Sequence, residues 1–325
     1  MPQALRSREF QLTAAILVLL VVVASRFPAF VAPGNLANVL NDTAPLILLA
    51  LGQTVVILTR CIDLSVAANL ALTGMAAAMV NVAFPGLPVP LIVAGAIAMG
   101  AILGAINGIL VWKLAIPPIV VTLGTLTIYR GLVFVLSDGQ WVNAHEMSDA
   151  FTALPRATVL GLPVLAWLAL IGVAAFMALV RYLPLGRAFY AVGGNPSVAV
   201  YAGIDPGRTQ FWAFVLSGAV SGLTGYLWVA RYQVAYVDIA GGFELEVVAA
   251  CVIGGISIAG GAGTILGALL GALFLGIVKN ALPVVGISPF WQLAISGAAI
   301  VIAVIANGRA QRRPGRQILR REVPA

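Results

Sequence analysis

Charged side chains are scarce in this sequence: Asp, Glu, Lys and Arg make up 9% of its 325 residues, whereas 61% are hydrophobic. A soluble domain usually has about a quarter charged residues, and here too little polar surface remains to cover an ordinary soluble fold. The apolar residues form long runs such as AAILVLLVVVA (14–24), without the alternation of a β-barrel strand. The sequence therefore predicts an all-α polytopic membrane protein.

Histidine and cysteine are nearly absent. His145 is the one histidine, and the string HEMS (145–148) lacks the second histidine of a zinc protease site, so no metal site is predicted. The two cysteines, Cys61 and Cys251, match neither a disulfide framework nor a metal-ligand spacing. We interpret both as small membrane residues.

Nucleotide-binding and catalytic motifs are also missing. The chain has no GxxxxGK[ST] loop and no GxGxxG fingerprint, and GGAGTILG (260–267) has the wrong spacing and opens an apolar run. Serines such as Ser217, Ser221 and Ser257 lie in apolar runs with no base nearby. We expect no catalytic residue, no enzymatic activity and no cofactor held by this chain.

A helix needs about 20 residues to cross a bilayer, and the apolar runs predict about ten such helices. The predicted spans are 11–30, 43–59, 64–82, 88–112, 117–136, 161–182, 209–230, 245–259, 263–282 and 288–306. Arg6 and Arg8 before the first run could belong to a secretory signal peptide, but no convincing cleavage site follows. We therefore predict a retained first helix.

The Lys and Arg positions predict the orientation, because cytoplasmic loops are enriched in these residues. With the N-terminus inside, thirteen of the eighteen basic residues fall on the cytoplasmic side, and seven of the eleven acidic residues fall outside. An even number of helices also places the basic tail inside. This distribution explains the net charge of +7 without a nucleic-acid partner.

Between the spans, the polar stretches are too short for a separate soluble module. We expect a single transmembrane domain over 1–325, with a cytoplasmic N-terminus (1–10) and a cytoplasmic basic tail (307–325). Residues 137–160 are the predicted outer loop, and 183–208 are the predicted inner loop.

Two glycine-rich segments resemble each other: GAILGAINGILV (100–111) and GTILGALLGALF (263–274). Glycine at every fourth position puts small residues on one helix face, which permits close helix packing. A weaker echo links 64–74 with 245–255. The copies lie five predicted helices apart, which indicates an inverted internal repeat like that of many transporters. The predicted packing glycines are Gly100, Gly104, Gly108, Gly263, Gly267 and Gly271.

The inner loop contains the string GGNPSVAVYAGID (193–205). Asn195 can cap a helix, Pro196 suits its first position, and Gly203 suits the left-handed position after its last turn. Such a helix is too short to be stable alone in water, and its small apolar face lacks the Lys and Arg of a lipid-surface helix. We expect a protein partner there.

Every acidic residue can be placed at or near a helix end, which disfavours a proton or ion relay. The transport pathway should then be lined by uncharged polar side chains, although each could instead make a helix–helix hydrogen bond. The candidate pathway residues are Asn69, Thr73, Asn107, Thr122, Thr125 and Asn280.

Four strings together resemble the permease subunits of bacterial ABC sugar importers of the ribose, rhamnose, xylose and autoinducer-2 type. They are LTRCIDLSVAANLALTG (58–74), IPPIVVTLGTLTIYRG (116–131), GGNPSVAVYAGI (193–204) and ELEVVAACVIGGISIAGGAGTILGALLGA (244–272). The resemblance runs over nearly the whole chain. It departs from the ribose type after IDLSV, where many members have glycine and serine. The string WVNAHEMS (141–148) is most similar to the rhamnose branch.

The resemblance implies a bacterial inner-membrane permease that works as a dimer with two cytoplasmic ATPase subunits, which bind the ATP, and a periplasmic sugar-binding protein. The loop 193–204 would then be the coupling helix that docks on the ATPase. The binding protein would dock on outer loops that include 137–160 and 231–244. The expected coupling residues are Gly194, Asn195, Pro196, Ala199, Ala202 and Gly203.

Several alternatives stay open at this point. Rhamnose is the first substrate expected, with ribose or autoinducer-2 as alternatives. The second permease could be identical or different. A stand-alone ion-coupled transporter is the alternative from another class.

Overall fold

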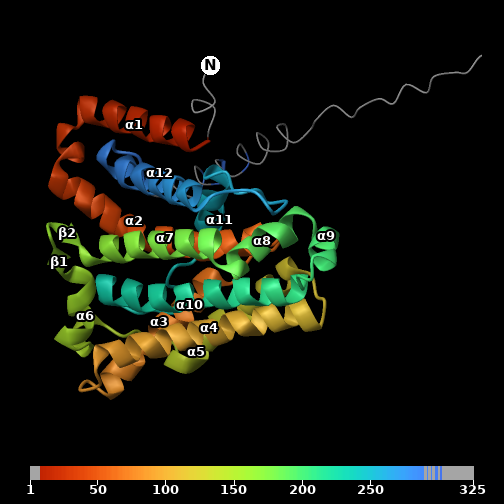
Figure 1. Ribbon diagram of the computed structural model, residues 1–325. Coiled ribbons are helices and arrows are strands. Elements are labelled where there is room, and N and C mark those ends of the chain that lie inside the picture. Colours follow the sequence, from red (N-terminus) through yellow and green to blue (C-terminus); the bar gives the residue numbers. More distant parts are fainter. Residues whose placement is uncertain (1–7, 289–290, 292–293, 295–296, 299–300, 302–325) are drawn as a thin grey trace, which may run out of the picture.

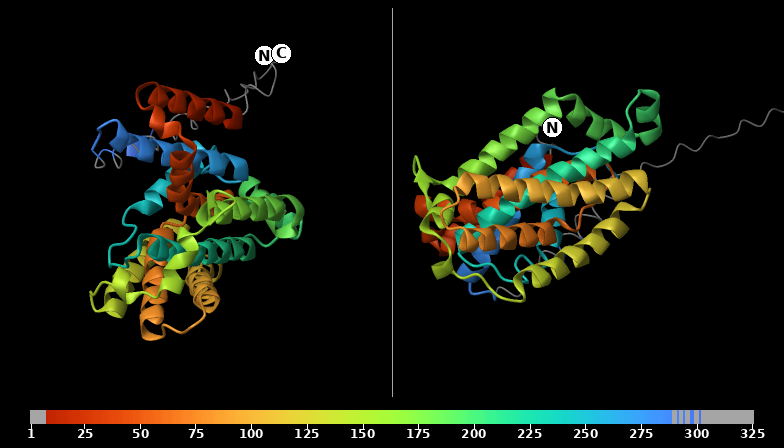
Figure 2. Two further views of the ribbon diagram at one scale, coloured as in Figure 1. Left: turned by 90° about the vertical axis from the view of Figure 1, so that its left-hand side faces the viewer. Right: turned by 90° about the horizontal axis from the view of Figure 1, so that it is seen from below.

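The computed structural model describes residues 8–288 together with 291, 294, 297–298 and 301. Within this part of the chain, the long helices lie roughly side by side in one bundle (Figures 1 and 2). Among the described residues, eight helices are long and apolar enough to cross a membrane. They are α1 (Arg8–Arg26), α2 (Pro33–Leu58), α3 (Val66–Ala83), α4 (Val89–Lys113), α5 (Pro118–Ser137), α7 (Val164–Tyr182), α10 (Pro206–Tyr232) and α12 (Ile265–Val284). The predicted all-α polytopic fold is confirmed.

Shorter elements connect these helices. They are η2 (Pro28–Val31), η3 (Ala144–Glu146), α6 (Asp149–Arg156), β1 (Thr158–Val159), β2 (Leu162–Pro163), α8 (Pro184–Gly194), α9 (Pro196–Tyr201) and α11 (Phe243–Ile253). β1 and β2 form an antiparallel hairpin in which Thr158 pairs with Pro163.

The predicted span 43–59 begins ten residues too late, because α2 starts at Pro33. The span predicted over 245–259 is wrong in its second half, because α11 ends at Ile253. Gly255, Gly260 and Gly261 all have positive φ values, a conformation that a helix does not contain, so the chain leaves the helix there. The last predicted span, 288–306, and the terminal segments 1–7 and 307–325 lie mostly or wholly outside the described residues.

The bundle has two distinct ends, which we name after the short helices there. The α9 end has α8, α9, the start of α10, and the loops 59–65 and 254–264. The α6 end has η3, α6, the hairpin and the loop 233–242. Figure 1 shows α9 and α6 on opposite sides of the picture. The predicted inner loop 183–208 and outer loop 137–160 therefore lie at opposite ends of the bundle.

The core is centred on α2, α3 and α10. The apolar window of α2 is 89% buried, whereas that of α1 is 6% buried. α1 packs on α12 at one side of the bundle, and α4 and α5 lie at the other (Figure 1). Their exposed apolar side chains, such as Val21 and Val135, suit contact with lipid tails.

Glycines permit the closest helix contact, between α4 and α10. A Cβ atom on Gly104 would overlap the carbonyl oxygen of Phe214, and one on Gly100 would overlap that of Gly218. Gly108 lies against Phe211. Because the backbones touch at these points, side chains larger than hydrogen do not fit.

The second glycine set packs against α11, but with two members rather than three. Gly267 lies against the carbonyl oxygen of Gly254, and Gly271 lies against that of Ala250. Gly263 precedes α12, has a φ of 139° and lies against Ile256. Its predicted place on the helix face is therefore wrong, because α12 begins only after Thr264.

The helices of the proposed repeat run in opposite directions. Ser65, at the start of α3, lies at the α9 end, whereas α11 starts near the C-terminal half of α10, with Phe243 against Trp228 at 5.0 Å between ring centroids. However, the first glycine set runs from the middle of α4 towards its C-terminal end, and Gly267 and Gly271 lie in the first half of α12. Both glycine sets therefore lie towards the α9 end. The similar sequences of the two segments do not occupy equivalent positions in two oppositely oriented helices.

Candidate coupling surface and transport site

Helix α9 has the local structure that its sequence predicts. The side-chain oxygen of Asn195 accepts hydrogen bonds from the backbone N–H groups of Ser197 at 3.1 Å and Val198 at 3.2 Å. Pro196 is the first helical residue, and Gly203 has a φ of 78°. These three positions fix where the helix begins and where the chain turns after it.

The tip of α9 is apolar and exposed. Tyr201 is 91% exposed, Val198 is 59% exposed and Val200 is 57% exposed. Gly194, Asn195, Ala202 and Gly203 are also exposed, and Pro196 is half-buried.

Ala199 is 2% exposed, so its predicted place on a docking face is wrong. A short helix must bury one side against its own protein, and Ala199 is on that side. The surface that a partner can reach is formed by Val198, Val200 and Tyr201.

A groove of about 640 Å³ lies beside α9, between α8 and the start of α10. Arg187 and Arg208 line it together with Trp212 and Asp205. The groove and the α9 tip both lie at the α9 end.

Arg60 attaches the α8–α9 junction to the bundle. Its side chain donates hydrogen bonds to the carbonyl oxygens of Gly193 at 2.7 Å and Gly194 at 2.9 Å. Gly193 has no room for a Cβ atom, because the carbonyl oxygen of Leu58 lies against it. The N–H of Gly261 donates to that same oxygen at 3.0 Å. Thus α9, the end of α2 and the loop 254–264 meet at one point.

From this point, the loop 59–65 connects to α4 and α5 through buried polar groups. Asp63 is 2% exposed, and its carboxylate accepts hydrogen bonds from the N–H of Ser65 at 2.9 Å and from its hydroxyl at 2.6 Å. Asn107 on α4 donates to the Ser65 hydroxyl at 2.8 Å. Thr122 on α5 donates to the carbonyl oxygen of Ile62 at 3.2 Å.

Arg60 and Asp63 are not among the site residues predicted from the sequence. A signal was available, because an acidic residue and a serine directly before an apolar run are typical of a helix start. The contact of Arg60 with Gly193 spans 133 positions in the chain, and no local pattern reveals it.

Five of the six candidate pathway residues lie in the buried interface of α3, α4 and α5. Asn69 donates to the carbonyl oxygen of Gly100 at 3.1 Å, and Thr73 donates to that of Asn69 at 2.7 Å. Thr125 bonds to the carbonyl oxygen of Thr122 at 3.4 Å. The bond of Asn69 and the bond of Asn107 to Ser65 join α3 and α4, as in the helix–helix alternative, whereas Thr73 and Thr125 bond within their own helices. Their role in a pathway stays a prediction.

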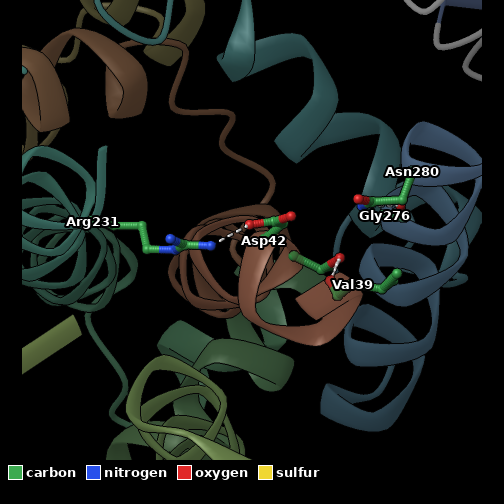
Figure 3. A network of polar contacts seen from close by, with 6 residues as sticks. Val39, Asp42, Arg231, Gly276 and Asn280 are labelled. Carbon is green, nitrogen blue, oxygen red and sulfur yellow. Dashed lines mark hydrogen bonds and ion pairs between the residues drawn. The ribbon is translucent and has the colours of Figure 1, made fainter. Parts of the chain in front are cut away.

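Asn280 lies apart from the other five, on α12, where it donates to the carbonyl oxygen of Gly276 at 2.9 Å. Figure 3 shows Asn280 and Asp42 on neighbouring helices, with Arg231 reaching Asp42 from α10. A pocket of about 200 Å³ between α2, α10, α11 and α12 is lined by Asp42, Trp228, Glu246 and Asn280, among others.

The α6 end has a folded polar surface beside the helices. In η3, the N–H of Asn143 donates to a carboxylate oxygen of Glu146 at 2.7 Å, and this bond lowers the pKa of that exposed carboxyl. The N–H of Val142 pairs with the carbonyl oxygen of Ala235 at 2.9 Å. The loops 137–160 and 233–242 therefore form one surface.

A polytopic bundle with buried polar interfaces, a partly polar pocket and a short exposed apolar helix at one end belongs to the class of membrane transport proteins. Residues 35–304 match the family described as the permease component of branched-chain amino acid transport systems. The chain belongs to this family. It is a multi-pass inner-membrane permease component, and its relatives are permeases rather than enzymes.

Several proteins with similar sequences are named as permeases of ribose or autoinducer 2 import systems. The chain is 36% identical over 300 residues to the ribose import permease protein RbsC of Escherichia coli (strain K12). This match covers 91% of this chain and 92% of that protein. It is 38% identical over 290 residues to RbsC of Bacillus subtilis (strain 168), with 89% of each covered. It is 37% identical over 310 residues to the autoinducer 2 import system permease protein LsrC of Klebsiella pneumoniae, with 95% and 89% covered. No solved structure matches the chain.

Proposed function

We propose that this chain is the membrane-spanning subunit of an ABC importer that moves a monosaccharide into the cell, with ATP bound by a separate ATPase. The observation that carries the proposal is the α9 tip: Tyr201 is 91% exposed, while Arg60 holds the base of the helix to the bundle. An exposed apolar helix with a rigid base can transmit a partner's movement into the helices behind it.

In this proposal, the α9 end faces the cytoplasm and receives two ATPase subunits, one for each permease of a dimer. Arg60, Arg187 and Arg208 lie at that end, which supports the assignment because cytoplasmic segments are enriched in basic residues. Both chain termini are then cytoplasmic. The surface of loops 137–160 and 233–242 faces outward and receives the sugar-binding protein.

The substrate is the finer part of the proposal. Rhamnose is the candidate from the string at 141–148, whereas the relatives' names give ribose and autoinducer 2. The relatives therefore support ribose and autoinducer 2 as alternatives.

The test is transport by the complete complex. The chain is reconstituted in liposomes with its ATPase and binding protein, and uptake of labelled rhamnose, ribose and autoinducer 2 is measured with and without ATP. We expect uptake of one of the three that disappears when the ATPase is omitted. Uptake by the chain alone, driven by an ion gradient, would instead establish the stand-alone transporter.

A further inference from the structure

We propose that the pocket between α2, α10, α11 and α12, hereafter the α12 pocket, binds the neutral sugar during transport. The inference rests on the proposed function and adds a substrate site to it. The pocket holds about 200 Å³, which is room for several water molecules or one sugar ring but not for a larger metabolite.

One wall of the α12 pocket is aromatic. Trp228 lies 5.2 Å from Tyr232 and 5.0 Å from Phe243, measured between ring centroids, and all three line the pocket. Aromatic faces offer an apolar, weakly negative surface. The C–H face of a sugar ring can lie against such a surface while its hydroxyl groups point elsewhere.

The other walls carry hydrogen-bonding groups that suit those hydroxyl groups. Asp42 and Thr43 come from α2, Glu246 from α11 and Asn280 from α12. Carboxylates accept hydrogen bonds, and an amide both donates and accepts. Figure 3 shows Asp42 and Asn280 on opposing helices, so the polar groups come from two sides.

Charge in the α12 pocket is balanced. Asp42 is 3.1 Å from Arg231, and Glu246 is 3.1 Å from Lys279. Among the described residues of these two pairs, two acidic and two basic groups leave no net charge to attract an ion. The pocket is therefore built for a neutral polyhydroxylated molecule rather than for a sugar phosphate or sugar acid.

The helix that carries Glu246 is a further observation in favour of a substrate site. Glu246 lies on α11, whose 11 residues are too few to cross a bilayer. Transporters often place their substrate sites at such interrupted helices.

The test uses a single reactive thiol in the permease–ATPase complex. Asn280→Cys places the thiol in the α12 pocket, while the native Cys61 and Cys251 are 1% and 0% exposed and give little background. Labelling with a small methanethiosulfonate reagent is timed in the presence of rhamnose, ribose or autoinducer 2. We expect the transported compound to slow labelling about threefold at twice its dissociation constant, and gluconate, which is charged, to have no effect.

Asn35→Cys is the matched control, because Asn35 is on α2 outside the pocket lining and donates to the carbonyl oxygen of Phe30. Its labelling rate should not change with sugar. A second measurement uses Asn280→Ala and Asn35→Ala in the transport assay. Loss of one hydrogen bond should raise the apparent KM about tenfold in the first and leave it unchanged in the second.

The outcomes separate the two proposals. If the wild-type complex transports none of the three compounds, the proposed function fails. If it transports one of them, but that compound neither protects Asn280→Cys nor has a raised KM with Asn280→Ala, the α12 pocket is not a transport site.

Discussion

At the scale of single residues, the contact between α4 and α10 depends on glycine. Gly104→Ala adds a Cβ atom where the carbonyl oxygen of Phe214 already lies. Overpacking of this kind costs about 1–3 kcal/mol, so we expect a lower melting temperature of the detergent-purified protein. Gly95→Ala on the same helix meets no atom within 4 Å and should not lower it. Equal melting temperatures for the two variants would mean that the helices are not in contact at Gly104.

Arg60 supports a second prediction at this scale. Arg60→Ala removes both hydrogen bonds to the α8–α9 junction, so the ATPase should still bind while ATP-driven uptake falls at least tenfold. Arg60 also has a φ of 67°, a conformation that favours glycine. Arg60→Gly therefore serves as the matched variant, since it removes the same guanidinium group without backbone strain.

If the hydrogen bonds matter, both Arg60 variants lose uptake equally. Recovery of uptake in Arg60→Gly alone would attribute the effect to backbone strain. Uptake and ATPase binding are measured on the same reconstituted samples.

Some of these residues could be predicted from the sequence, and others could not. The Asn195 cap, Pro196 and Gly203 were predictable, because capping depends on neighbours two or three positions away. The burial of Ala199 was not, because it depends on which side of α9 meets the bundle. Arg60 and Glu246 were missed for the same reason: their partners, Gly193 and Lys279, are far away in the chain.

At the scale of elements, α9 is the segment whose function can be tested alone. Tyr201→Arg places a charge on its most exposed apolar position, and a buried unpaired charge at an interface is costly. We expect at least a tenfold loss of ATPase association in a pull-down, with normal membrane insertion. Leu160→Arg is the control, because Leu160 is 88% exposed but lies in the hairpin turn at the α6 end.

Unchanged association with Tyr201→Arg would show that α9 is not the docking element. Equal loss in both variants would point to a general defect of the membrane domain. Ala199→Arg is unsuitable for this test, because a charge at a position 2% exposed would disturb the fold of α9 itself.

The long helices could be predicted where they coincide with a continuous apolar run. Eight predicted spans correspond to the eight long helices of the described residues, although α2 begins ten residues before its predicted start because its first turns are polar. The error at α11 arose because 245–259 is apolar except for Glu246 and Ser257, and hydropathy does not detect a loop that is packed within the protein. The glycines at 254, 255, 260 and 261 were the available sign of an interruption.

At the scale of the whole molecule, the orientation of the bundle across the membrane connects the sequence, the fold and the function. The basic residues predict that the α9 end is cytoplasmic, and the structure separates α9 from α6 along the bundle (Figure 1). If α9 faced outward, it could not meet a cytoplasmic ATPase. The orientation therefore decides the coupling role proposed for α9.

Thiol labelling from each side of the membrane tests this orientation. Tyr201→Cys and Leu160→Cys place thiols at positions that are 91% and 88% exposed, and the native cysteines are buried. We expect a membrane-impermeant reagent to label Leu160→Cys in intact spheroplasts and Tyr201→Cys only in inside-out vesicles. The reverse pattern would overturn the cytoplasmic assignment of α9, and labelling of both thiols from one side would mean that the two ends do not face opposite compartments.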